Sequence, residues 1–129
     1  MSYKEMDALC EQSGPGAGGV TFESDLSVGG SISGITLSTT AADIIYALYE
    51  GVSRDISDAV SKLGGAKCLK VFGGGAKSDI WCRILARISG IPVEVLDTSE
   101  TASLGAAILA SGGKIAPAGV KKTLMPQNG

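Results

Sequence analysis

The most regular pattern of apolar and polar positions in this chain runs from residue 40 to residue 63. Apolar side chains recur there at steps of three and four residues: Ile44, Leu48, Val52, Ile56, Val60 and Leu63. This period places them in one stripe along a helix, and such a stripe is the side that a helix buries. Thr40 and Asp43 form an approximate capping box at the start, and Gly64 with Gly65 predicts a left-handed end. We therefore predict a long amphipathic helix over 40–63.

One glycine interrupts this helical pattern. Gly51 lies in the middle of the predicted helix, where glycine costs about 1 kcal/mol relative to alanine. We expect a compensating contact, so the sequence predicts that a neighbouring element approaches the helix closely at this residue.

Shorter patterns predict the remaining elements. We expect helices over residues 2–12, 78–89 and 100–111, and strands over 19–22, 31–37, 68–72 and 91–96. Asp97 with Glu100 is expected to cap the last helix. The periodicity ends after Gly112, so residues 1–112 are expected to form one domain and 113–129 a tail or the start of a truncated element. This order of helices and strands predicts an α/β fold, with parallel pairing in its later half.

Two of these elements carry apolar side chains whose placement can be predicted. In the helix over 78–89, one face is expected to hold Trp81, Ile84, Leu85 and Ile88. In the strand over 31–37, Ile32, Ile35 and Leu37 are consistent with a position between the edge and the core.

Composition and charge narrow the class of protein. The 129 residues fit one domain with an ordinary apolar content of 44 %, and the net charge of −2 offers no basic surface for nucleic acid. No apolar run approaches the roughly 18 residues that span a bilayer. The N-terminal residues are too polar for a secretory signal. We expect a reduced, cytoplasmic protein that binds neither nucleic acid nor membrane.

The chain contains no histidine, and this restricts its chemistry. The three cysteines form no CxxC pair, so we predict no metal site. Mechanisms of the Ser–His–Asp or Cys–His type cannot be assembled from this chain alone. Asp25 and Asp43 could be considered as general bases, but Asp43 suits the first turn of a helix and Asp25 a loop. We therefore predict no catalytic residue.

A run of three glycines stands between the strand over 68–72 and the helix over 78–89. Gly73, Gly74 and Gly75 permit positive φ angles and remove side chains from one surface, while the following helix presents free N–H groups. Such a turn suits a nucleotide, because a sugar or base can lie on bare backbone and the helix dipole favours phosphate. The same glycines also fit a plain strand-to-helix turn. A dinucleotide-binding turn fits less well, since the glycines are consecutive.

Two segments resemble a known family. The segment "LKVFGGGAKSDIWCRILARISGIPVEVLDTSETASLGAAILA" is similar to the C-terminal domain of the FGGY carbohydrate kinases, a family that includes xylulokinases and glycerol kinases. Upstream, "GSISGITLSTTAADIIYALYEGV" resembles the C-terminal signature of the same family. The resemblance covers about residues 3–112.

This resemblance implies an actin-like, ribonuclease-H-like domain with a mixed sheet flanked by helices. It implies ATP-dependent phosphorylation of a sugar or polyol hydroxyl, with Mg²⁺ in the complete enzyme. The nucleotide is expected to contact Gly73, Gly74, Gly75, Ala76, Ser78 and Asp79, while Lys77 is expected to be solvated. The N-terminal kinase domain, which carries the sugar site and the catalytic aspartate in the family, is expected to be a missing partner. The isolated chain is then expected to bind ATP or ADP at best and to be inactive as a kinase.

A different class of function stays open. A degenerate kinase module that acts by protein association is the alternative to a nucleotide-binding half. Without its partner domain such a module would expose apolar surface, which favours self-association into a homo-oligomer.

Overall fold

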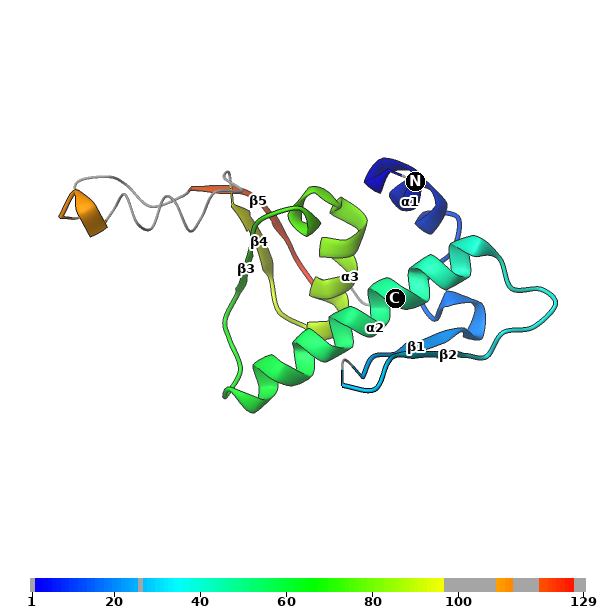
Figure 1. Cartoon of the computed structure of the whole chain (residues 1–129). Helices are drawn as coiled ribbons and strands as arrows, with labels where there is room; N and C mark the ends of the chain where they lie inside the picture. The colour runs from blue at the N-terminus through cyan, green and yellow to red at the C-terminus, as the bar shows by residue number, and fades with distance from the viewer. Residues whose placement is uncertain (1, 26, 97–108, 113–118, 127–129) are drawn as a thin grey trace.

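The computed structural model describes residues 2–25, 27–96, 109–112 and 119–126 (Figure 1). In chain order the elements are α1 (Tyr3–Cys10), the 3₁₀ turn η1 (Ala17–Gly19), β1 (Thr21–Glu23), β2 (Ser31–Ser33), α2 (Ala41–Lys62), β3 (Leu69–Val71), the 3₁₀ turn η2 (Gly75–Lys77), α3 (Asp79–Ser89), β4 (Val93–Leu96) and β5 (Val120–Leu124). Apart from residues 109–111, the predicted helix over 100–111 lies outside the described residues, as do Asp97 and Glu100 of its predicted cap.

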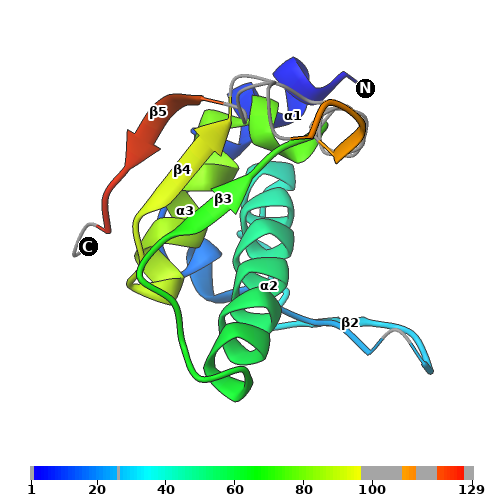
Figure 2. The same cartoon turned by 90° about the vertical axis from the view of Figure 1, so that its left-hand side faces the viewer.

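The strands form two small sheets. β1 and β2 make an antiparallel hairpin, with Phe22 opposite Ile32. In the other sheet β4 is central: β3 pairs with it in parallel and β5 pairs with it antiparallel. α3 connects β3 to β4 and covers one face of this sheet (Figure 2). This mixed sheet with flanking helices confirms the predicted α/β class and its parallel pairing.

β5 is an element that the sequence pattern did not predict. Its residues Val120–Leu124 pair with β4, with a register irregularity between Val95 and Leu96. Two adjacent lysines in this strand hide the alternation that marks a half-buried strand, and charged residues of this kind are typical of sheet edges.

Helix α2 begins as the sequence predicts. Thr40 Oγ1 accepts a hydrogen bond from the backbone N–H of Asp43, and Asp43 Oδ2 accepts one from the N–H of Thr40 at 2.9 Å, so the predicted capping box is confirmed. Two residues after the helix, Gly64 has a φ of +98°, as expected for a left-handed end. A Cβ at Gly51 would lie 2.6 Å from both Phe22 Cδ1 and the Phe22 carbonyl oxygen. The close approach predicted at Gly51 is therefore confirmed, and β1 is the element that approaches.

The predicted apolar stripe of α2 is not its buried side, which corrects the sequence interpretation. Val52 and Leu63 are exposed and the other four residues of the stripe are half-buried, although Ile56 packs against a hydrophobic cluster. The residues that α2 buries are instead Ala42, Ile45, Tyr46, Ala47, Glu50, Gly51 and Ser53. This face combines the large side chains of Ile45 and Tyr46 with small and polar residues, and α1, β1 and α3 pack against the helix, so an apolar period alone does not identify it.

The strand predicted over 31–37 is also shorter and more exposed than expected. It ends at Ser33, and Ile32, Ile35 and Leu37 are all exposed. A Cβ at Gly34 would lie 2.2 Å from the Gly19 carbonyl oxygen, and Gly34 has a φ of +79°. The extended strand therefore ends at Gly34, which lies against the backbone just before β1, and this position accepts glycine only.

Helix α3 lies between two hydrophobic clusters. Ile80 and Ile84 pack with residues of α1 and α2, including Cys10, Ile45 and Tyr46. Cys82, Leu85 and Ala86 pack with Val93 and Val95 of the sheet. The side chains predicted to share one face of this helix thus divide between the clusters: Ile84 and Ile88 join the first, Leu85 and Trp81 the second.

Candidate functional site

The glycine turn connects the end of β3 to the start of α3. Gly73 has a φ of +85°, and Gly74 has helical angles of −61° and −45°. η2 then closes with hydrogen bonds from the Lys77 N–H to the Gly74 carbonyl at 3.2 Å and from the Ser78 N–H to the Gly75 carbonyl at 3.1 Å. The predicted strand, glycine turn and helix therefore occur in this order, with a 3₁₀ turn inserted before α3.

The three glycines differ in the reason why a residue with a Cβ would or would not fit at each position. Gly73 needs its positive φ, which side chains with a Cβ rarely adopt. A Cβ at Gly75 would lie 3.4 Å from Cζ3 of Trp81, in ordinary contact with the indole ring. Gly74 needs neither: its φ is negative, and no described atom lies within 4 Å of the place where its Cβ would stand. No described residue therefore covers the backbone of Gly74, which leaves room for a ligand to lie directly on it.

Ser78 is the N-cap of α3. Its Oγ accepts a hydrogen bond from the Trp81 N–H at 3.2 Å and donates one to Asp7 Oδ1 of α1 at 2.8 Å. The residue is only 4 % exposed. The structure therefore places Ser78 inside the packing beneath the turn, and its predicted contact with a nucleotide stays a prediction.

Asp7 and Tyr49 belong to this arrangement but were not found from the sequence. Asp7 Oδ1 also accepts a hydrogen bond from Tyr49 Oη of α2 at 3.0 Å. Burial, followed by the hydrogen bond to Asp7, raises the pKa of Tyr49 to about 12. Asp7 and Ser78 are 71 residues apart, so no local pattern could have joined them.

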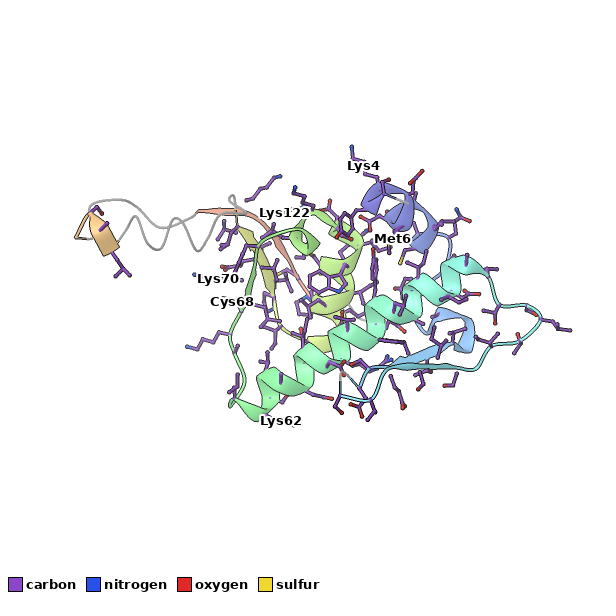
Figure 3. The ribbon with its side chains drawn as sticks, in the orientation of Figure 1. Lys4, Met6, Lys62, Cys68, Lys70 and Lys122 are labelled. Carbon is purple, nitrogen blue, oxygen red and sulfur yellow. The ribbon has the colours of Figure 1, made fainter. Side chains whose placement is uncertain are left out.

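The other predicted site residues lie around the turn. Ala76 is buried at 7 % exposure, whereas Lys77 is exposed. Asp79 is exposed and forms an ion pair with Lys122 of β5, which lies beside the start of α3 in Figure 3. The structure thus brings the glycines, Ala76 and Asp79 together at one end of α3.

A hollow of about 450 Å³ lies along α3, next to α2 and to the residues that follow α1. Its walls include Tyr46, Ile80 and Ile84 together with Arg83 and Arg87. Both guanidinium groups are already paired, Arg83 with Glu11 at 3.5 Å and Arg87 with Glu50 at 2.5 Å. The hollow therefore presents no unpaired arginine to a ligand.

The described residues contain neither a metal-binding cluster nor a membrane-spanning helix. No group of three or more His, Cys, Asp or Glu side chains there is arranged to hold a metal ion. No helix in this part of the chain is long and apolar enough to cross a membrane.

Known kinases are similar in sequence to this chain. The chain is 40 % identical over 91 residues to a glycerol kinase of Pseudothermotoga lettingae, covering 67 % of this chain and 18 % of that protein. It is 32 % identical over 126 residues to a xylulose kinase of Staphylococcus epidermidis, covering 87 % of this chain and 25 % of that one. The chain thus spans a quarter or less of the length of these relatives.

Solved structures of kinases have the same fold as this chain. The crystal structure of xylulose kinase from Rhodospirillum rubrum matches with a TM-score of 0.83 at 23 % identity, covering 97 % of this chain and 30 % of that one. Plasmodium falciparum glycerol kinase with ADP matches with a TM-score of 0.75 at 20 % identity, covering 98 % and 30 %. These likenesses confirm the predicted fold, a mixed sheet flanked by helices.

The family follows from residues 16–112, which match the C-terminal domain of the FGGY family of carbohydrate kinases. This range includes the hairpin, α2, the glycine turn, α3 and β4. It accounts for most of the chain and contains both segments on which the resemblance was based. The chain therefore belongs to the FGGY family of carbohydrate kinases and represents its C-terminal domain.

Proposed function

We propose that this chain is the nucleotide-binding part of an ATP-dependent carbohydrate kinase, an enzyme that transfers phosphate to a hydroxyl of a sugar or polyol. The family membership and the names of the relatives support the reaction class. The glycerol kinase structure named with ADP supports a nucleotide as the ligand of this fold. The proposed contacts are Gly73, Gly74, Gly75, Ala76, Ser78 and Asp79.

The single observation that carries the proposal is the uncovered backbone of Gly74 in the turn before α3. Glycine costs more conformational entropy on folding than any other residue, and at Gly74 neither φ nor crowding by described atoms explains it. Gly14 shares these two properties, but only Gly74 stands in the turn before the N-terminus of α3, where a ligand lying on the backbone would be displaced by a Cβ. In glycine-rich turns before helices, the absence of a Cβ lets the backbone approach a nucleotide closely.

The chemistry of the complete reaction needs more than this chain. Phosphoryl transfer depends on groups positioned around the γ-phosphate, including Mg²⁺. Because the chain spans a quarter or less of its relatives, we expect the sugar site and the catalytic group to come from the remainder of the kinase. ATP supplies the transferred phosphoryl group, and the part proposed for this chain is to hold the adenosine side.

The test is a titration of the chain with ADP, followed by calorimetry and by the fluorescence of Trp81. Trp81 is the single tryptophan and its ring lies against Gly75, so its emission is expected to change when the turn is occupied. The Gly74→Ala variant is expected to fold as stably as the wild type, or slightly more so, while binding ADP at least tenfold more weakly.

Gly14→Ala is the matched control. Gly14 also has no described atom within 4 Å of its Cβ position and no positive φ, and it lines the hollow beside α3 instead of belonging to the turn. This variant is expected to bind ADP like the wild type. If Gly74→Ala binds ADP as tightly as Gly14→Ala, or if the wild type shows no ADP binding in either measurement, the proposal is wrong.

The alternative function, association with another protein, has one observation in its favour. Val28, Leu37 and Leu63 are large apolar side chains that the described structure leaves more than four-fifths exposed. A chain that binds no nucleotide but increases in size with concentration in light scattering would favour this alternative. A monomer that binds ADP would exclude it as the main function.

A further inference from the structure

The geometry points to Asp7 as a positioning residue for the glycine turn: its carboxylate holds Ser78 Oγ and thereby fixes the residues that we propose contact the nucleotide. This inference rests on the proposed function for its consequence in binding. The positioning itself is a property of the chain without any ligand.

The first step is the contact between α1 and the start of α3. Ser78 Oγ donates to Asp7 Oδ1 at 2.8 Å. A hydrogen bond to a charged carboxylate is stronger than one between neutral groups. Ser78 is buried, so water cannot easily replace Asp7 as its acceptor.

The second step leads from Ser78 to the turn. The same Oγ accepts from the Trp81 N–H at 3.2 Å, and the Ser78 carbonyl accepts from the Cys82 N–H at 3.1 Å. On its other side, Ser78 closes η2 through its N–H to the Gly75 carbonyl at 3.1 Å. The side chain of Ser78 therefore caps the first turn of α3, while its main chain joins this turn to η2, so a shift of Ser78 moves both.

The third step concerns the rigidity of Asp7. Tyr49 Oη donates to the same oxygen, Asp7 Oδ1, at 3.0 Å. Tyr49 belongs to α2, whose N-terminus is fixed by its capping box. Asp7 is thus held from a second helix, so it offers Ser78 an acceptor in one place.

A second contact between α1 and α3 serves as the matched control, because it can hold the two helices together without touching the glycine turn. Glu11, which directly follows α1, pairs with Arg83 of α3 at 3.5 Å, and both side chains are more than half exposed. This pair also joins α1 to α3 but lies away from the glycine turn. A role in holding helices together would be shared by Asp7 and Glu11, whereas a role in positioning the turn belongs to Asp7 alone.

The experiment measures amide hydrogen exchange and ADP affinity in the full chain, well below the unfolding midpoint. Asp7→Ala is expected to speed exchange of the Lys77, Ser78 and Trp81 amides about tenfold or more, with no change at the strand amides of β4. It is expected to weaken ADP binding about tenfold. Asp7→Asn keeps an acceptor oxygen and is expected to stay within about threefold of the wild type in both. Glu11→Ala is expected to match the wild type.

A double variant tests whether the effect of Asp7 on the turn passes through Ser78. If Asp7 acts through Ser78, adding Asp7→Ala to Ser78→Ala is expected to weaken ADP binding no further than Ser78→Ala alone. Ser78→Ala breaks the same hydrogen bond from the other side, so it carries the test if Asp7→Ala does not fold.

Three results would overturn the inference: unchanged exchange at the three turn amides in Asp7→Ala, equal effects of Asp7→Ala and Glu11→Ala, or additive effects of Asp7→Ala and Ser78→Ala. A wild type without ADP binding would overturn the proposed function instead. The exchange measurements would then still decide whether Asp7 fixes the turn.

Discussion

Arg87 of α3 donates a hydrogen bond to Glu50 of α2 over 2.5 Å between Nη2 and Oε1, in the seam where the two helices pack. The Glu50 side chain is 7 % exposed and that of Arg87 is 23 % exposed. The same Glu50 oxygen accepts from the Gly16 N–H at 3.1 Å. This carboxylate therefore connects α2, α3 and the loop before β1.

We predict that Arg87→Ala lowers the free energy of unfolding by about 3 kcal/mol, because it leaves the Glu50 carboxylate buried without its cation. Urea denaturation measures this. The matched control is Arg83→Ala, four residues earlier on the same helix, since its pair with Glu11 is exposed on both sides. That variant is expected to lose less than about 1 kcal/mol. Equal losses in the two variants would contradict the role of the buried pair.

Gly51→Ala is expected to destabilise the chain in spite of the better helix propensity of alanine. The propensity gain is about 1 kcal/mol, whereas forcing atoms into a filled space costs about 1–3 kcal/mol. The new Cβ would lie 2.6 Å from the Phe22 carbonyl oxygen, a backbone atom that cannot rotate away. We therefore expect a net loss in urea denaturation, which Phe22→Leu does not rescue. A Gly51→Ala variant as stable as the wild type would contradict this packing.

The stability of the chain is expected to depend on pH through Asp43. Hydrogen bonds from the Ser13 hydroxyl and the Thr40 N–H hold the pKa of Asp43 below its ordinary value of 3.8. A pKa that is lower in the folded state gives stability above the unfolded value, and this stability is lost as the pH falls through the folded value. The urea midpoint of the wild type should exceed that of Asp43→Asn at neutral pH, and the difference should close below about pH 4. A difference that does not change with pH would contradict the shift.

The cysteines are expected to differ in reactivity. Burial raises the pKa of Cys10 to about 12 and that of Cys82 to about 11, and both side chains are fully buried. The thiolate is the reactive form, so neither should react near neutral pH in the folded chain. Cys68 is half-buried. We predict that a thiol reagent such as DTNB modifies Cys68 in the native state and all three cysteines in urea; rapid native modification of Cys10 or Cys82 would contradict this.

The sequence predicted those features whose physical cause is local. The cap at Thr40, the left-handed end at Gly64 and the order of strand, glycine turn and helix depend on neighbouring residues only, and the structure contains them. The crowding at Gly51 could be anticipated because the glycine is unfavourable there without it. The identity of the crowding residue, Phe22, could not.

The features that the sequence did not predict depend on contacts between distant segments. The buried side of α2 contains Glu50 and Ser53, which a hydrophobic pattern counts as exposed. Glu50 is paired with Arg87, and Ser53 Oγ donates to the Tyr49 carbonyl at 2.7 Å, so both groups are satisfied inside the protein. In the candidate site, the glycines stood out in the sequence, but Asp7 did not, because its partner Ser78 is 71 residues away.

The position of α3 between the two hydrophobic clusters has a consequence for cooperativity. Ile80 and Ile84 belong to one cluster and Leu85 to the other, so neither cluster can come apart without freeing a face of the same helix. The chain should therefore unfold as one unit rather than as two halves. Loss of helical circular dichroism and the change in Trp81 emission should then follow one and the same transition.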